Sequence, residues 1–211
     1  RITVELIKGM LNATRREMEA LITRTAMSPF IREKKDFFTA ILNPAGELVV
    51  STSLTLAGNL VDAILQQYPA DTMQDGDLFW YNDPYATGGA VSHLPDMVFV
   101  MPVFAENRLV AFIECWGHLW DIGGTVPGSI SPTASSVFQE GVMIPPVRVI
   151  HGGVRNEEGV RIFTRNSRFP DMLEGDLNSL VAACNLGRKR LEECAALHGA
   201  DALENAFEAI I

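Results

Sequence analysis

Two apolar runs follow one another in residues 97–118, MVFVMPVFAENRLVAFIECWGH, with only Glu106 and Asn107 between them. Apolar runs of this length that are interrupted by turn residues predict two strands joined in a β-hairpin. An antiparallel hairpin brings its two open ends together. Residues just before position 97 and residues just after position 117 are therefore expected to be neighbours in space, although they are far apart in the sequence.

Histidine and aspartate occur at both open ends of this hairpin. His93 and Asp96 come just before its first strand, and His118 and Asp121 come at the end of its second strand. Imidazole nitrogen and carboxylate oxygen are ligands that manganese, iron or zinc accepts. The hairpin therefore predicts a metal site at its ends, built from His93, Asp96 and His118.

Each of these residues also has a simpler interpretation. His93 can hydrogen-bond the neighbouring carboxylate of Asp96, and His118, which lies between two tryptophans, can be a packed side chain. Asp121 can be a fourth ligand, an acceptor for the second ring N–H of a ligating histidine, or a cap for the Gly-Gly turn that follows. Asp36 is a further candidate ligand, although an aspartate after the charged run EKK is usually solvated.

Other polar residues give weaker signals. Residues 83–89 carry two glycines but lack the Lys-Ser/Thr ending of a phosphate-binding loop. Arg165 and Arg168 could pair with a carboxylate or a phosphate of a substrate. Cys115 is interpreted as a buried strand residue rather than a nucleophile.

The remaining patterns predict an α+β fold, with a mixed, largely antiparallel sheet and flanking helices. The apolar stripe of residues 3–27 and the pattern of residues 173–198 are typical of amphipathic helices. The turn NPAG separates the strands of a second hairpin, and Asp36 comes at the start of its first strand. Further helices are expected at 57–70, 131–137 and from Asp201 onward, and further strands at 77–81 and 146–153.

Composition limits the possible classes of protein. The chain has 211 residues, of which 47% are apolar and 20% charged, which suits a single domain over residues 1–211. A net charge of −9 argues against binding to nucleic acid, and no apolar run is long enough to span a membrane. Three cysteines without CxxC spacing fit a reducing cytoplasm. Because the chain starts without Met and ends on the apolar run AFEAII, it is expected to be part of a longer polypeptide.

Several motifs occur in a fixed order: NDPYATGG (82–89), HLPD (93–96), GHLWDIGGTVPGS (117–129), QEGVMIPP (139–146), NSRFP (166–170) and GDL (175–177). In this order they resemble the hydantoinase B/5-oxoprolinase family, which includes the large subunits of acetone and acetophenone carboxylases. The resemblance covers nearly the whole chain. It implies that the chain is the N-terminal portion of such a protein.

The resemblance also implies a mechanism and a set of ligands. A hydantoinase A-type partner would use ATP to phosphorylate the substrate, and this subunit would complete the reaction at manganese or zinc. The expected assembly is a cytoplasmic hetero-oligomer with that partner and a small third subunit. The family's metal ligands correspond to Asp36, His93, Asp96 and His118. Asp121 then lies outside the ligand set, and it is expected to assist catalysis together with Arg168.

One departure from the family pattern bears on the reaction. Hydantoinase-like members tend to carry a second histidine directly after the ligand, as HHxDVGG, where this chain has Leu119 and Trp120. A bulky apolar pair suits a site that excludes water, so the first expectation is a ketone carboxylase that joins a phosphorylated enol to CO2 derived from bicarbonate. The alternatives are ATP-dependent hydrolysis of a cyclic amide and a non-catalytic assembly module with a structural metal.

Overall fold

A seven-stranded sheet forms the centre of the computed structural model, which describes residues 2–52 and 60–211. The strand order is β2-β1-β5-β4-β3-β6-β7, and every pairing between these strands is antiparallel. The strands are β1 (Phe37–Leu42), β2 (Leu48–Ser51), β3 (Leu78–Tyr81), β4 (Asp96–Ala105), β5 (Arg108–His118), β6 (Val147–His151) and β7 (Val154–Arg155). The predicted α+β class is confirmed, and the described sheet is wholly antiparallel rather than mixed.

Strands β4 and β5 form the predicted central hairpin. Their register runs from Ala105 opposite Arg108 to Asp96 opposite His118. Glu106 and Asn107 both have positive φ, 52° and 61°. A two-residue turn of this kind has the twist that the two flanking strands require.

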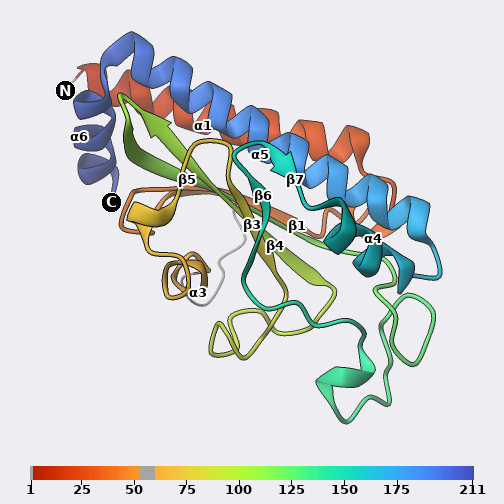
Figure 1. Cartoon of the computed structure of the whole chain (residues 1–211). Coiled ribbons are helices and arrows are strands. Elements are labelled where there is room, and N and C mark those ends of the chain that lie inside the picture. The colour runs from red at the N-terminus through yellow and green to blue at the C-terminus, as the bar shows by residue number, and fades with distance from the viewer. Residues whose placement is uncertain (1, 53–59) are drawn as a thin grey trace.

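Three helices cover one face of the sheet: α1 (Ile2–Thr25), α5 (Pro170–His198) and α6 (Ala200–Ile210) (Figure 1). The predicted stripe of α1 is buried, and Ile7, Met18 and Ile22 have no exposed surface. Gly187 in α5 is needed for close packing, because a Cβ atom there would lie 2.8 Å from the sulfur of Met18. The sequence alone suggested only that this glycine weakens the helix.

A second apolar cluster lies on the opposite face of the sheet, where the short helix α3 (Asp62–Leu65) packs (Figure 1). The helix predicted at 57–70 is reduced, within the described residues, to α3 and a 3-10 turn at Ala70–Thr72, and positions 57–59 lie outside those residues. No helix in the described part of the chain is both long enough and apolar enough to cross a lipid bilayer.

Three short elements differ from the expectation. The helix predicted at 131–137 is absent, because the side-chain oxygen of Gln139 accepts the backbone N–H groups of Ser135 and Ser136. Only a 3-10 turn, Val137–Gln139, forms there. Helices α2 (Pro29–Arg32) and α4 (Glu157–Arg165) were not predicted from the sequence. Each begins after a residue whose side chain accepts a backbone N–H, Ser28 for α2 and Asn156 for α4.

Candidate metal centre

His118 in β5, Asp96 in β4 and Asp36, the residue directly before β1, lie at the same level of the sheet. Asp96 is directly opposite His118 in the β4–β5 ladder. On the other side, the N–H of His118 donates to the backbone oxygen of Asp36 at 3.0 Å, which extends the β1–β5 ladder by one residue. Residues directly opposite each other in a sheet point to the same face. The sheet therefore presents all three side chains together at one end.

This cluster faces away from the long helices. The neighbouring residue Gly117 faces them, because a Cβ atom there would meet the side chains of Ile31 and Leu180. Successive side chains of a strand alternate between faces, so His118 points to the opposite side.

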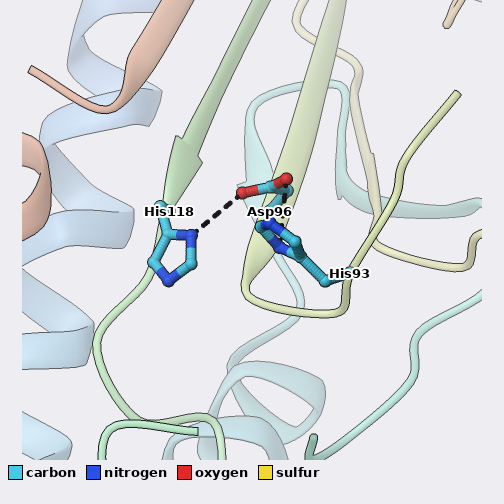
Figure 2. A group of neighbouring side chains, drawn as sticks. All are labelled: His93, Asp96 and His118. Atoms are coloured by element: carbon cyan, nitrogen blue, oxygen red, sulfur yellow. Dashed lines mark ion pairs between the residues drawn. The ribbon is translucent and has the colours of Figure 1, made fainter. Parts of the chain in front are cut away.

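His93 reaches the same point from the loop before β4. Its Nδ1 lies 3.3 Å from Oδ2 of Asp96, and Nδ1 of His118 lies 3.2 Å from Oδ1 of the same carboxylate. Figure 2 shows the carboxylate between the two imidazole rings, whose centroids are 5.1 Å apart. One ligand atom from each of the three residues lies within 4.8 Å of the others. The convergence predicted from the hairpin is therefore present.

Several polar atoms in this cluster are buried but make no hydrogen bond. They are Nδ1 and Nε2 of His118, Nδ1 of His93 and Oδ1 of Asp96. His118 is only 4% exposed, so its ring nitrogens are shielded from bulk solvent. Buried polar groups are nearly always paired, and an unpaired one costs about 1–3 kcal/mol. Imidazole nitrogens and a carboxylate that converge in this way fit the donor set of a divalent cation.

Asp36 lies at the margin of the cluster. Its Oδ2 is 3.7 Å from Nδ1 of His118, and its side chain is 39% exposed. It therefore stands apart from the tight group of three, and its nearest atom in that group is Nδ1 of His118.

An apolar wall supports His118. Phe30, from helix α2, stacks on the imidazole at 4.6 Å between ring centroids and also contacts Trp120 at 5.1 Å. Leu119 is fully buried, and its N–H donates to the oxygen of Pro95 at 2.8 Å. Sequence reasoning missed Phe30, because nothing in the sequence indicated that the turn after the first helix returns to the end of β5.

Asp121 and Arg168 are brought together, but in a second cluster. The buried carboxylate of Asp121 accepts hydrogen bonds from the N–H groups of Gly123 and Gly128 and from both the N–H and Nη1 of Arg168. The guanidinium of Arg168 also donates to three backbone oxygens of residues 123–126. Burial raises the pKa of Asp121, but these hydrogen bonds outweigh it and hold the pKa below its ordinary value.

Asp121 does not accept a hydrogen bond from His118, because neither ring nitrogen of His118 has a hydrogen-bond partner. Arg165 lies on α4 and lines an open groove with Arg161 and Ile162. Cys115 is fully buried on the helix-covered face, and burial raises the pKa of its thiol, which agrees with its interpretation as a packed strand residue.

The chain is similar to known proteins over most of its length. The family model described as Hydantoinase B/oxoprolinase matches residues 1–211. Caprolactamase subunit beta of Pseudomonas jessenii is 32% identical over 204 residues, which cover 95% of this chain and 35% of that protein. The delta subunit of acetophenone carboxylase from Aromatoleum aromaticum is 29% identical over 181 residues, which cover 83% of this chain and 26% of that protein.

The fold is also similar to a solved structure. The crystal structure of ATP-dependent caprolactamase from Pseudomonas jessenii matches with a TM-score of 0.88 and 30% identity, over 99% of this chain and 36% of that one. The chain thus spans about a third of the length of the relatives that it matches most closely among these.

Proposed function

The chain belongs to the hydantoinase B/oxoprolinase family, and we propose that it carries the metal-binding active site of a subunit of an ATP-dependent enzyme. The observation that carries this proposal is the convergence of His93, Asp96 and His118, whose buried polar atoms have no other partners. Residues 1–211 would form a single metal-binding domain at the N-terminal side of the whole subunit.

The proposed ligands are His93, Asp96, His118 and, at the margin, Asp36. A divalent manganese or zinc ion bound there would supply Lewis acidity toward a substrate oxygen. The chain's own residues supply the rest: Asp96 offers a carboxylate between two imidazoles, and Phe30 holds the ring of His118 in place. The stacked Phe30 covers one side of the His118 ring and shields it from water.

ATP-dependent hydrolysis of a cyclic amide is the reaction that the comparisons favour. Caprolactamase subunit beta is more similar to this chain than the acetophenone carboxylase subunit, at 32% against 29% identity and 95% against 83% coverage. The ketone carboxylase expected first from the sequence therefore becomes the second candidate. We propose a lactam or a similar cyclic amide as the substrate class.

Ketone carboxylation keeps one specific observation in its favour. Leu119 is fully buried and Trp120 contacts Phe30, so two apolar side chains follow His118 where a second histidine is typical of hydantoinase-like members. A site that carboxylates an enolate benefits from apolar side chains that exclude water.

The proposed assembly is a hetero-oligomer. The similar proteins are named as a beta subunit and a delta subunit, which supports a multi-subunit organisation. A hydantoinase A-type partner would bind ATP and phosphorylate the substrate. This division of labour agrees with the loop at 83–89, which lacks the Lys-Ser/Thr ending of a nucleotide-binding loop.

The test uses the full-length subunit, purified with its hydantoinase A-type partner. Metal content is measured first, and ATP consumption is then followed with caprolactam, hydantoin and 5-oxoproline, and separately with acetone and acetophenone plus bicarbonate. Ring opening supports the first candidate, and bicarbonate-dependent loss of ketone supports the second. A complex that contains stoichiometric metal but turns over none of these compounds would favour the structural-metal alternative. A complex that takes up no metal would refute the proposal.

A further inference from the structure

The loop that carries His93 is held by two side chains from other parts of the molecule. The amide nitrogen of Asn82 donates to the backbone oxygen of Leu94 at 2.8 Å, and Oε2 of Glu140 accepts the N–H of Leu94 at 2.8 Å. Leu94 lies between His93 and Asp96 and is itself fully buried. We refer to the side chains of Asn82 and Glu140 as the Leu94 clamp.

Asn82 is firmly fixed. It has no exposed surface, and its amide nitrogen also donates to the oxygen of Val142 at 2.9 Å. Its side-chain oxygen accepts the N–H of Ile144 at 2.6 Å, and its own N–H donates to the oxygen of Ile144. All hydrogen-bonding groups of the side chain are thus engaged, so Asn82 joins the end of β3, the His93 loop and residues 142–144 into one unit.

His93 depends on its loop more than the other two ligands depend on theirs. His118 and Asp96 belong to strands that are hydrogen-bonded to each other, and Phe30 also stacks on His118. The side chain of His93 is 43% exposed, and among the described residues its ion pair is with Asp96 and its ring contact is with His118. The direction of its Cα–Cβ bond is therefore set by the backbone of residues 93–96.

We propose that Asn82 and Glu140 are positioning residues, which hold His93 at the distance from Asp96 and His118 that a shared cation requires. The inference rests on the proposed function, since it assumes that the cluster binds metal. The two bonds of the Leu94 clamp grip the N–H and the C=O of one residue from opposite sides. Both bonds restrain the backbone of Leu94, and with it the position of the Cα atom of the adjacent His93. Groups that orient metal ligands in this way typically change metal affinity 10–100-fold when they are removed.

The experiment measures binding of Zn2+ or Mn2+ alone to the full-length complex, by competition with a fluorescent chelator. In Asn82→Ala and Glu140→Ala, the dissociation constant is expected to rise about 10–100-fold. Glu140→Gln keeps an oxygen that accepts the N–H of Leu94, so its affinity should stay within about threefold of wild type. This rescue separates a hydrogen bond from an effect of charge, because Glu140→Gln also removes the negative charge.

Asp77→Ala is the matched control. Asp77 is also fully buried and also accepts backbone N–H groups, those of Gln74 and Gly152, but it lies before β3, at the end of that strand away from Asn82. This variant should lose stability and keep its metal affinity. An equal loss of affinity in Asp77→Ala, or wild-type affinity in folded Glu140→Ala, would overturn the inference. Wild-type protein that binds neither cation would instead refute the proposed function itself.

Hydrogen exchange provides a second measurement if the alanine variants fail to fold. The amide of Leu94 is bonded to Glu140 and buried, so it should exchange slowly in wild type and in Glu140→Gln. Rapid exchange of this amide in the wild-type complex would show that the Leu94 clamp is not closed, and would contradict the inference without reference to metal.

Discussion

Two carboxylates near the end of the central hairpin have opposite environments. Both oxygens of Asp121 are occupied by donors, from Gly123, Gly128 and Arg168. Asp96 lies between the imidazoles of His93 and His118, and its Oδ1 has no hydrogen bond. The hydrogen-bonding capacity of Asp121 is thus met by described residues of this chain, whereas that of Asp96 is not.

This difference separates a structural role from a ligand-binding role for residues that look alike in the sequence. The bonds of Asp121 and Arg168 all close the loop at 121–128, so their recorded contacts serve the shape of the chain. In the histidine cluster, one ligand atom from each of His93, Asp96 and His118 lies within 4.8 Å of the others, which is the arrangement that the proposed cation requires. The catalytic role expected for Asp121 and Arg168 stays a prediction, and the experiments below test the contrast.

Removal of His118 should have the largest effect. His118→Ala deletes a buried ligand atom, so bound metal should be lost and ATP-dependent turnover should fall at least about a thousandfold, equivalent to about 4 kcal/mol of transition-state stabilisation. His198→Ala, at the end of α5, is the control and should behave as wild type. Metal analysis and turnover are measured on the same preparation. Full turnover in folded, metal-free His118→Ala would show that the histidine cluster has no catalytic metal, and the contrast with the Asp121 cluster would fail.

The carboxyl group of Glu114 can be compared with those of Asp121 and Asp96, because its environment differs from both. It lies on the same strand and face as His118, is 3% exposed, and has no ion-pair partner among the described residues. Burial alone raises its pKa to about 8. The carboxyl is therefore expected to be neutral at pH 7, kept so by burial and not by a cation or a set of amides.

The sign of the pH dependence follows from this shift. Between the pKa of the unfolded chain, about 4.3, and the folded value of about 8, the unfolded state loses the proton and the folded state keeps it. Glu114 therefore reduces stability progressively as pH rises through this interval. Glu114→Gln should remove the effect and raise the free energy of unfolding at pH 8 by about 4 kcal/mol. Urea unfolding of wild type and of Glu114→Gln at pH 5 and pH 8 measures this difference in the free energy of unfolding. An equal pH dependence in the two proteins would contradict the raised pKa of Glu114.

The sequence was sufficient to predict that His93, Asp96 and His118 converge, because these residues are related by one local element. The alternation of the apolar runs and the turn at Glu106-Asn107 fix a hairpin, and a hairpin must bring His93 and Asp96 close to His118. The side of the sheet that they occupy follows from the same two-residue period. No knowledge of the long helices was required.

Other parts of the site could not be predicted, because they depend on contacts between distant segments. The bond between Asp121 and Arg168 spans 47 positions, and that between Leu94 and Glu140 spans 46. The local periodicity of the sequence does not indicate which distant loops will contact each other. Helix α4 was missed for a different reason: it has only nine residues, its buried face consists of Val160, Phe163 and Thr164 alone, and its start depends on the cap formed by Asn156.

Arg168→Ala tests the closed cluster. Its guanidinium contacts Asp121 and three loop oxygens, but it is 39% exposed, so its loss should cost about 2 kcal/mol of unfolding free energy and leave bound metal unchanged. The pKa of Asp121 is lowered, so this carboxylate stabilises the fold above the unfolded pKa of about 3.9 and loses that effect as pH falls through the folded value. Acid unfolding of Arg168→Ala should therefore begin at a higher pH. Loss of turnover with normal stability and metal content would instead support the catalytic role predicted from the sequence.

Asp36→Asn should have the smallest effect of the four changes and defines the edge of the open cluster. Asp36 is 3.7 Å from Nδ1 of His118 and 39% exposed, so as a marginal ligand it should change the metal dissociation constant about tenfold, or 1.4 kcal/mol. Glu33→Gln, three residues earlier, removes the same charge without the contact to His118 and should leave the affinity unchanged. If both variants lose affinity equally, and the loss disappears in high salt, Asp36 acts only through its charge. If Asp36→Asn instead loses metal as completely as His118→Ala, the ion requires four ligands, and three neighbouring strands together with the His93 loop must all be in place before it binds.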